Sequence, residues 1–137
     1  MKHIFLSLPL CLCLNIVFAQ TTKTTVDSLE KRYQQCLSEG KSSYNCALQY
    51  YAAMDSLLDA VYRQLYGKLD NNRRELLQVS QAQWVQKKDA YFRDIDLRVE
   101  KKRPLTLSGL DDDMIVTDNK AAYLRTRVIE LLASTRS

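Results

Sequence analysis

Apolar residues recur every three or four positions through most of this chain, which is the spacing of a buried helical face. The clearest stripe predicts a helix over residues 44–69, with its apolar positions at Ala47, Tyr50, Tyr51, Met54, Leu57, Leu58, Val61, Leu65 and Leu69. Weaker stripes predict helices over residues 26–38, 73–103 and 118–133. Residues 105–117 are polar and are predicted to form a loop, and no stretch predicts a sheet.

Residues typical of helix ends separate these stripes. Gly40 is expected to end the first helix, and Ser42 or Ser43 to cap the start of the second. Asp70-Asn71-Asn72 predicts a short turn, and two long helices joined by a short turn pack antiparallel. We therefore expect an all-α fold, a small antiparallel bundle built on a long two-helix hairpin, with the first and last helices covering that hairpin.

Polar residues interrupt the apolar stripe of the third predicted helix. Ser80, Gln81 and Lys88 lie on or near its apolar face. Buried polar groups can fix the register of packed helices. Our hypothesis is that Gln81 and Lys88 reach polar groups on the second helix.

The first 19 residues have the order of a secretory signal peptide. A basic start at Lys2 and His3 precedes an apolar run, which ends in the small residue Ala19. The run is shorter than the roughly 20 residues that span a bilayer. We expect cleavage after Ala19 and an exported protein, periplasmic or secreted. A lipoprotein modified at Cys11 or Cys13 is a minor alternative, as is a retained anchor.

The predicted mature chain has a simple organisation. Residues 20–25 are Thr-rich and are expected to form a flexible N-terminus, followed by a single domain over residues 26–135. Two cysteines remain, Cys36 and Cys46, and in an oxidising compartment they predict one disulfide. Two free buried thiols are the alternative.

Charge and composition exclude several function classes. Removing Lys2 lowers the 20 basic residues to 19, against 16 acidic residues, so the mature net charge is +3. These charges form no concentrated stripe, which argues against nucleic-acid binding. The sole histidine lies in the leader, so histidine-based nucleophilic sites and the usual zinc sites cannot form.

Two groups of carboxylates remain as candidates for catalytic or metal chemistry. Asp55 and Asp59 lie one helical turn apart, a spacing that usually serves a helix surface. Asp111, Asp112 and Asp113 match no calcium-loop spacing and are expected to form an exposed acidic loop. We therefore expect no enzyme, no metal site and no cofactor.

Tyrosine is abundant, and the second predicted helix carries five of the eight tyrosines. Tyrosines often anchor interfaces because they combine a large apolar ring with a polar tip. Tyr62 and Trp84 are expected in the core. Tyr50, Tyr51 and Tyr66 cannot all face one core, so with Asp111 to Asp113 they form a candidate binding surface. The alternative is that they too are core residues with satisfied hydroxyls.

A set of short motifs carries a resemblance to a known family. In order these are Cys36, Cys46-Ala47, Asp55-x-x-Leu58-Asp59-x-x-Tyr62, Gln81-x-x-Trp84 and Lys88-Asp89. Together they resemble the lysozyme-inhibitor LprI-like family of small exported bacterial helical proteins, best over residues 33–96. A further similarity lies at Arg125-x-Arg127-x-x-x-Leu131. From the residues alone, we expect the motif positions to have mainly structural roles.

The chain departs from the family pattern at three places. Asp59 stands where Asn is common, and Tyr91 and Phe92 stand where a further cysteine is often seen. Lys88 replaces the usual Arg, and an ammonium cannot make the bidentate contacts of a guanidinium.

The resemblance implies an exported protein that binds lysozyme or another cell-wall hydrolase by protein–protein contact. The alternative is an envelope interaction or assembly module that binds another protein or peptide and has no effect on lysozyme. A hydrolase using carboxylates is the least favoured reading. No nucleic acid and no stable membrane insertion are expected, and the oligomeric state stays open.

Overall fold

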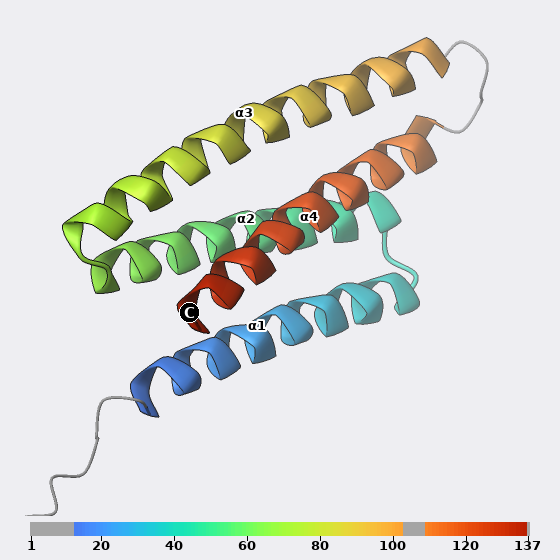
Figure 1. Cartoon of the computed structure of the whole chain (residues 1–137). Coiled ribbons are helices and arrows are strands. Elements are labelled where there is room, and N and C mark those ends of the chain that lie inside the picture. Colours follow the sequence, from blue (N-terminus) through green and yellow to red (C-terminus); the bar gives the residue numbers. More distant parts are fainter. Residues whose placement is uncertain (1–12, 103–108, 137) are drawn as a thin grey trace, which may run out of the picture.

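The computed structural model describes residues 13–102 and 109–136, and within these ranges it is helical with no strand. The four helices are α1 (Cys13–Ser38), α2 (Ser43–Lys68), α3 (Asn71–Lys102) and α4 (Gly109–Ala133), and a 3-10 turn (Ser134–Arg136) follows α4. Figure 1 shows successive helices running in opposite directions. The predicted all-α antiparallel bundle is confirmed. None of the described helices is long and apolar enough to cross a bilayer.

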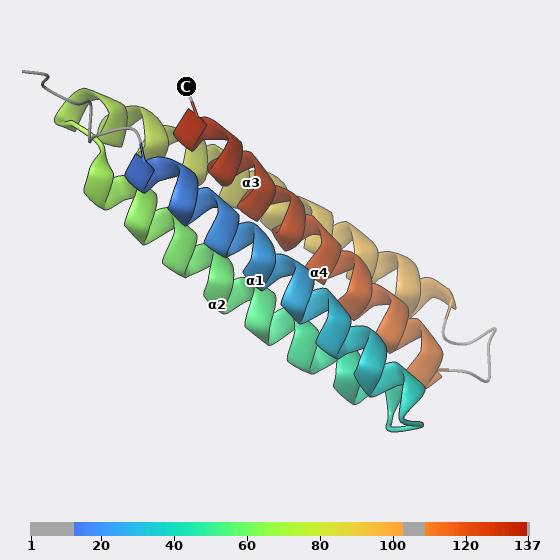
Figure 2. The same ribbon diagram turned by 90° about the horizontal axis from the view of Figure 1, so that it is seen from below.

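The parallel pair α2 and α4 forms the centre of the bundle. These two helices make the most extensive backbone contacts, and α1 packs mainly on α2 (Figures 1 and 2). Helix α3 leaves the turn after α2 and makes its main contacts with α4. The last helix therefore does more than cover the α2–α3 hairpin, because it packs against both of its arms.

Small and aliphatic side chains explain the close approach of α2 and α4. Ala47 and Ala121 are fully buried, and a methyl side chain lets two helix axes come near each other. The core around them also contains residues of α1 and α3. Its buried members are Val26, Tyr33, Cys46, Ala47, Tyr50, Met54, Leu58, Val61, Leu65, Leu77, Ala121, Leu124, Val128, Leu131 and Leu132.

Helix α3 is packed far more loosely than the other described helices. Only Leu77 and Ile95 are buried along its 32 residues. Trp84, Tyr91 and Val99, which lie at helical spacing from Leu77 and Ile95, are only half-buried. The polar insertions in this stripe explain the difference, because a face that mixes apolar and polar groups cannot enter a dry core.

The start of α4 corrects the predicted loop. Residues 109–117 are helical, so the helix begins at Gly109 rather than near Asp118. Residues 103–108 lie outside the described part. Three aspartates at positions 111–113 favour this early start, because carboxylates near a helix N-terminus interact favourably with the helix dipole.

Helix α1 also begins earlier than its apolar stripe predicts. Residues 20–25 are part of this helix in the full-length chain, and Thr22 is 4% exposed. The expected flexibility of this segment in the mature protein stays a prediction. The same holds for the signal peptide, of which residues 1–12 lie outside the described part.

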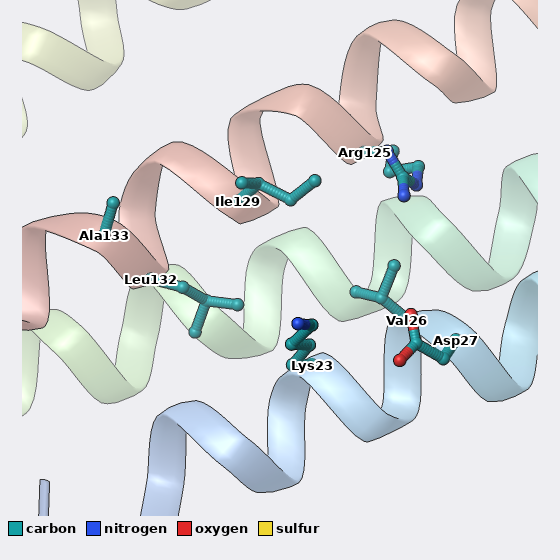
Figure 3. A pocket seen from close by; sticks show the side chains of 7 residues that line it. All are labelled: Lys23, Val26, Asp27, Arg125, Ile129, Leu132 and Ala133. Carbon is teal, nitrogen blue, oxygen red and sulfur yellow. The ribbon is translucent and has the colours of Figure 1, made fainter. Parts of the chain in front are cut away.

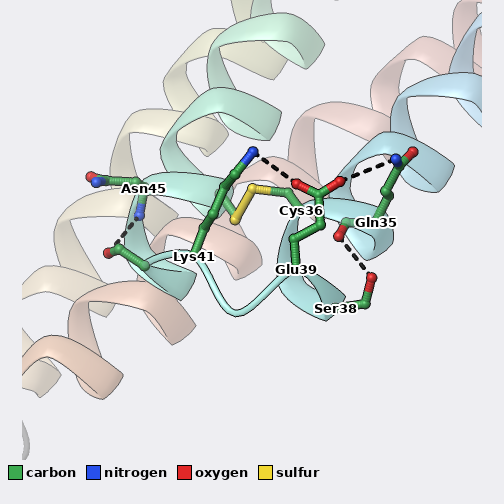
Figure 4. The surroundings of a disulfide bond; sticks show 8 residues. Gln35, Cys36, Ser38, Glu39, Lys41 and Asn45 are labelled. Atoms are coloured by element: carbon green, nitrogen blue, oxygen red, sulfur yellow. Dashed lines mark hydrogen bonds and ion pairs between the residues drawn. A yellow bond between two sulfur atoms is a disulfide. The ribbon is translucent and has the colours of Figure 1, made fainter.

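A disulfide closes the turn between α1 and α2, as predicted. Cys36 and Cys46 are bonded, with their Cα atoms 5.8 Å apart (Figure 4). Gly40 adopts a φ of 71°, a left-handed conformation that favours glycine after a helix end. Ser42 caps α2 by accepting a hydrogen bond from the Asn45 amide at 3.4 Å. The predicted end of α1 and the predicted start of α2, which lie between the two cysteines in the sequence, are confirmed.

The turn between α2 and α3 is held by two side chains. Asp70 accepts a hydrogen bond from the Arg73 amide at 3.0 Å and so caps the start of α3. The Nε of Arg74 donates to the Tyr66 carbonyl at 2.9 Å, at the end of α2. A cation interacts favourably with the negative C-terminal end of the α2 dipole. These two side-chain contacts hold the turn, which contains neither glycine nor proline.

Candidate functional site

Most of the family-motif residues on α2 meet Gln81 of α3 in one groove. The groove has a volume of about 360 Å³, and we call it the motif groove. It lies between α2 and α3. Its lining residues are Asp55, Ser56, Leu58, Asp59, Tyr62 and Gln81. Residues far apart in the sequence that carry the family resemblance are thus neighbours in space.

The motif groove has an apolar floor and an acidic rim. Leu58 is 5% exposed and belongs to the core, whereas Asp55 and Asp59 are exposed. Asp59 pairs with Arg63 one turn along α2, at 2.8 Å. Burial together with the nearby Asp55 carboxylate raises the pKa of Tyr51. Because Leu58 is buried, its role is structural. The exposed carboxylates of Asp55 and Asp59 can be reached by a partner, the second of them within its ion pair with Arg63.

Gln81 does not make the contact that the sequence suggested. Its Oε1 accepts a hydrogen bond from the Nε of Arg127 at 3.1 Å, and Arg127 lies on α4 rather than α2. The guanidinium also donates to Ser80 and Glu130, each at 3.0 Å. Among the described residues no hydrogen bond joins Gln81 or Lys88 to α2. The hypothesis named the wrong partner helix for Gln81, although a polar contact between helices does form there.

Arg127 is the residue whose contacts the sequence did not predict. It is 8% exposed, and its Cζ lies 5.7 Å from the centre of the Trp84 ring. The sequence contains a signal for it, because Arg127 falls on the same helical stripe as Leu124 and Leu131. A buried arginine on an apolar stripe needs polar partners, which Ser80, Gln81 and Glu130 provide.

Lys88 contacts aromatic rings on its own helix. Its Nζ lies 5.8 Å from the Trp84 ring centre and 5.7 Å from that of Phe92, and it pairs with Asp89 at 3.2 Å. A cation over an aromatic face is attracted without any bidentate geometry. The change from Arg to Lys at this position is therefore compatible with the contacts observed.

Aromatic rings form a layer between α3 and α4, centred on Tyr123. The Tyr123 ring stacks on Tyr91 at 4.7 Å between centroids and lies 5.9 Å from Trp84. Phe92 meets it edge-on at 6.1 Å and also contacts Tyr51 of α2 at 6.3 Å. This layer takes the place of an aliphatic core along α3, and Trp84 is half-buried within it.

The candidate surface tyrosines have different environments. Tyr50 is 8% exposed and stacks on Tyr33 at 4.7 Å, which leaves little of its ring for a partner. Tyr51, Tyr62 and Tyr66 are half-buried. Arg74 lies over the Tyr66 ring, 5.1 Å from its centre. Tyr62 lines the motif groove, and because it is only half-buried it is not the core residue that the sequence predicted.

The acidic segment at residues 111–113 lies in the first turns of α4, not in the exposed loop that the sequence predicted. Asp112 and Asp113 are half-buried and have interaction partners, and the side chain of Asp111 is outside the described set. Their role in binding stays a prediction. No group of three or more His, Cys, Asp or Glu side chains that could hold a metal ion occurs within the described part of the chain.

A second groove lies between α1 and α4 and shares no lining residue with the motif groove. Figure 3 shows Lys23 and Val26 of α1 and Arg125, Ile129 and Leu132 of α4 among the residues that line it. The groove has a volume of about 230 Å³. Arg125 is already ion-paired with Glu30 of α1, so this groove mainly joins the two helices.

Comparison with known proteins gives one match. Residues 36–131 match the family model described as lysozyme inhibitor LprI. This range begins at the first disulfide cysteine and ends in α4, so it includes both sides of the motif groove and the Arg127 contacts. No curated protein and no solved structure matches the chain.

Proposed function

Because the chain belongs to the lysozyme inhibitor LprI family, we propose that it is an exported protein that inhibits lysozyme or a related cell-wall hydrolase by protein–protein contact. The observation that carries this proposal is the family match over most of the chain. A disulfide supports export, because such bonds persist in oxidising compartments.

The motif groove is the surface that we propose meets the enzyme. Many lysozymes are strongly basic, and a protein of net charge +3 gains no long-range attraction towards them. Binding then requires a local acidic or aromatic surface. Asp55 and Asp59 on the rim, with Tyr62 beside them, supply such a surface, whereas Asp112 and Asp113 are half-buried and engaged elsewhere.

The direct test is a lysozyme titration with the purified mature protein. We expect lysis of bacterial cell walls to fall with increasing protein and to stop falling at one inhibitor per enzyme. Undiminished lysis at high micromolar protein would contradict the proposal.

A matched pair of variants tests the role of the motif groove. Asp59→Lys reverses a charge on its rim, whereas Asp94→Lys makes the same change on α3, away from the groove. Both aspartates are exposed and both pair with an arginine four residues later, at 2.8 and 2.7 Å. We expect Asp59→Lys to weaken inhibition by roughly tenfold, about 1.4 kcal/mol, and Asp94→Lys to change it little. Equal effects of the two variants would exclude the groove as the contact surface.

Exposed apolar side chains on α3 support the second candidate, an envelope assembly module. Leu76 and Val79 are 71% and 57% exposed, one helical turn apart. Such residues can contact a partner protein. Capture of a single non-hydrolase partner from an envelope extract, lost in Leu76→Ser with Val79→Ser, together with unchanged lysis, would favour this alternative.

A further inference from the structure

A third groove, which we call the α3–α4 slot, lies between α3 and α4, and Arg127 is one of its lining residues. It has a volume of about 300 Å³, at the lower end of the roughly 300–1,000 Å³ of small-molecule sites. Its lining residues are Ser80, Gln83, Trp84, Lys87, Tyr123, Thr126, Arg127 and Glu130.

Two aromatic rings form one wall of the α3–α4 slot. The rings of Trp84 and Tyr123 are 5.9 Å apart between centroids, with an angle of 31° between their planes. Lys88 and Arg127 lie over the Trp84 ring and Tyr91 stacks on Tyr123, so only the remaining, solvent-accessible part of each half-buried ring lines the slot. An aromatic wall of this kind favours a ligand with at least one flat or apolar face.

The rim of the slot has unused hydrogen-bonding capacity of both kinds. Ser80 accepts from Arg127 through its oxygen, which leaves its hydroxyl hydrogen free to donate. The Thr126 hydroxyl donates to the Ala122 carbonyl, which leaves its oxygen free to accept. One oxygen of Glu130 is likewise free, because only Oε2 accepts from Arg127. A ligand that fits this rim must both donate and accept hydrogen bonds.

The charges in the slot favour a neutral ligand. Arg127 is 8% exposed and its guanidinium donates to Gln81, Ser80 and Glu130, so it has little left to offer a phosphate or carboxylate. Glu130 opposes an anion directly, and Lys87 opposes a cation. An entirely apolar ligand would leave the polar groups of the rim without partners.

We propose that the α3–α4 slot binds a neutral saccharide. A sugar ring combines an apolar face of C–H groups, which packs on the Trp84 and Tyr123 rings, with hydroxyls that both donate and accept. This site is separate from the motif groove and does not depend on the inhibition of lysozyme.

The single tryptophan of the chain makes the proposal directly measurable. Because Trp84 lines the slot and is the only Trp, its fluorescence, excited at a wavelength that tyrosine does not absorb, reports on the surroundings of this one side chain. The exported protein, free of lysozyme, is titrated with a trimer of N-acetylglucosamine and separately with maltotriose. We expect a saturable change in fluorescence with a dissociation constant on the order of 1 mM for at least one sugar. Tighter binding of one trimer than of the other shows whether an acetamido group contributes to binding. If neither trimer produces a saturable change in fluorescence, the proposal is overturned.

Two glutamine variants on α3 locate the binding. Gln83→Phe fills the slot from its exposed rim, whereas Gln78→Phe makes the same exchange at an exposed position that does not line the slot. We expect Gln83→Phe to weaken sugar binding at least tenfold and Gln78→Phe to leave it within about twofold, with the helix content of both unchanged. Sugar binding that survives in Gln83→Phe would overturn the assignment to this slot.

Discussion

The contact of α4 with α2 and its contact with α3 are built from different chemistry. The first uses small and aliphatic residues, among them Ala47, Ala121, Leu124 and Val128, which are almost fully buried. The second uses half-buried aromatic rings with cations over them, and its one buried charge is Arg127. Apolar burial scales with area and is non-directional, whereas aromatic and charged contacts require particular geometry.

The difference shows how stability and binding surface are divided in this molecule. Helices α1, α2 and α4 supply nearly all of the buried core, and α3 contributes only Leu77 to it. Because most side chains of α3 lie outside the core, grooves remain on both sides of this helix. The motif groove lies between α3 and α2, and the slot lies between α3 and α4. The loosely packed helix therefore borders both of the surfaces that we propose bind other molecules.

The largest expected effect comes from emptying the α2–α4 core. Leu124 is 1% exposed, so Leu124→Ala loses apolar burial and leaves a cavity, and we expect unfolding free energy to fall by about 2–5 kcal/mol. Leu76→Ala on α3 is the matched control, because Leu76 is 71% exposed and should change stability by less than about 0.5 kcal/mol. Urea unfolding measures both. Similar losses in the two variants would remove the contrast between the regions.

Removing the disulfide should have the next largest effect. The bond closes a short loop, with a sequence separation of 10. The double change Cys36→Ala and Cys46→Ala should lower the unfolding free energy by about 2–3 kcal/mol. The loss acts on the attachment of α1 to α2, so circular dichroism should still show a helical fold at low temperature. A protein unaffected by the double change would mean that the core alone fixes α1.

Arg127→Met tests how much the polar contacts between α4 and α3 contribute to stability. Methionine keeps much of the packing against Trp84 but removes the hydrogen bonds to Ser80, Gln81 and Glu130. We expect a loss of about 1–2 kcal/mol, modest for a buried charge because Ser80 and Glu130 are exposed and can bind water instead. A double-mutant cycle with Gln81→Met should give a coupling energy above about 0.5 kcal/mol. Additive effects would show that the Arg127–Gln81 contact contributes nothing to stability.

The smallest effect concerns the stacked tyrosines of the core. Burial, with the nearby Asp118 carboxylate, raises the pKa of Tyr33 to about 12, and burial with Glu30 raises that of Tyr50 to about 12. Folding thus favours the protonated phenols. Their stabilising contribution is complete below pH 10, the ordinary Tyr value, and is lost as pH rises from 10 through 12.

Unfolding measured across this pH range checks the tyrosine prediction. Stability should decline above pH 10, and the decline should be smaller in Tyr33→Phe, which cannot ionise at that position. An unchanged slope in that variant would place the pH dependence on other groups.

The sequence predicted the α2 core well and the α3 side poorly. Regular apolar spacing at Ala47, Met54, Leu58 and Val61 specified the buried face of α2, because burial follows directly from helical periodicity. The helix ends at Gly40 and Ser42 followed from local backbone chemistry. By contrast, the partner of Gln81 depended on which helix lies next to α3, and periodicity carries no information about that.

The motif groove could be predicted only as a set of residues. Asp55, Asp59, Tyr62 and Gln81 were singled out by their order in the sequence. Their gathering in one groove depends on α4 packing between the arms of the hairpin, which leaves room between α2 and α3. The α3–α4 slot depends on Tyr123 and Arg127 of the last helix, and no sequence pattern indicated which helix either residue contacts.

Hydrogen exchange of the backbone amides, measured with and without lysozyme, tests the central claim most directly. For the free protein we predict weaker protection in α3 than in α2 and α4, because local opening of α3 exposes little apolar surface. With lysozyme bound, protection should rise around residues 55–62 and 78–84, on the two sides of the motif groove. Equal protection of all helices in the free protein, or a lysozyme effect confined to the α1–α4 face, would contradict the account.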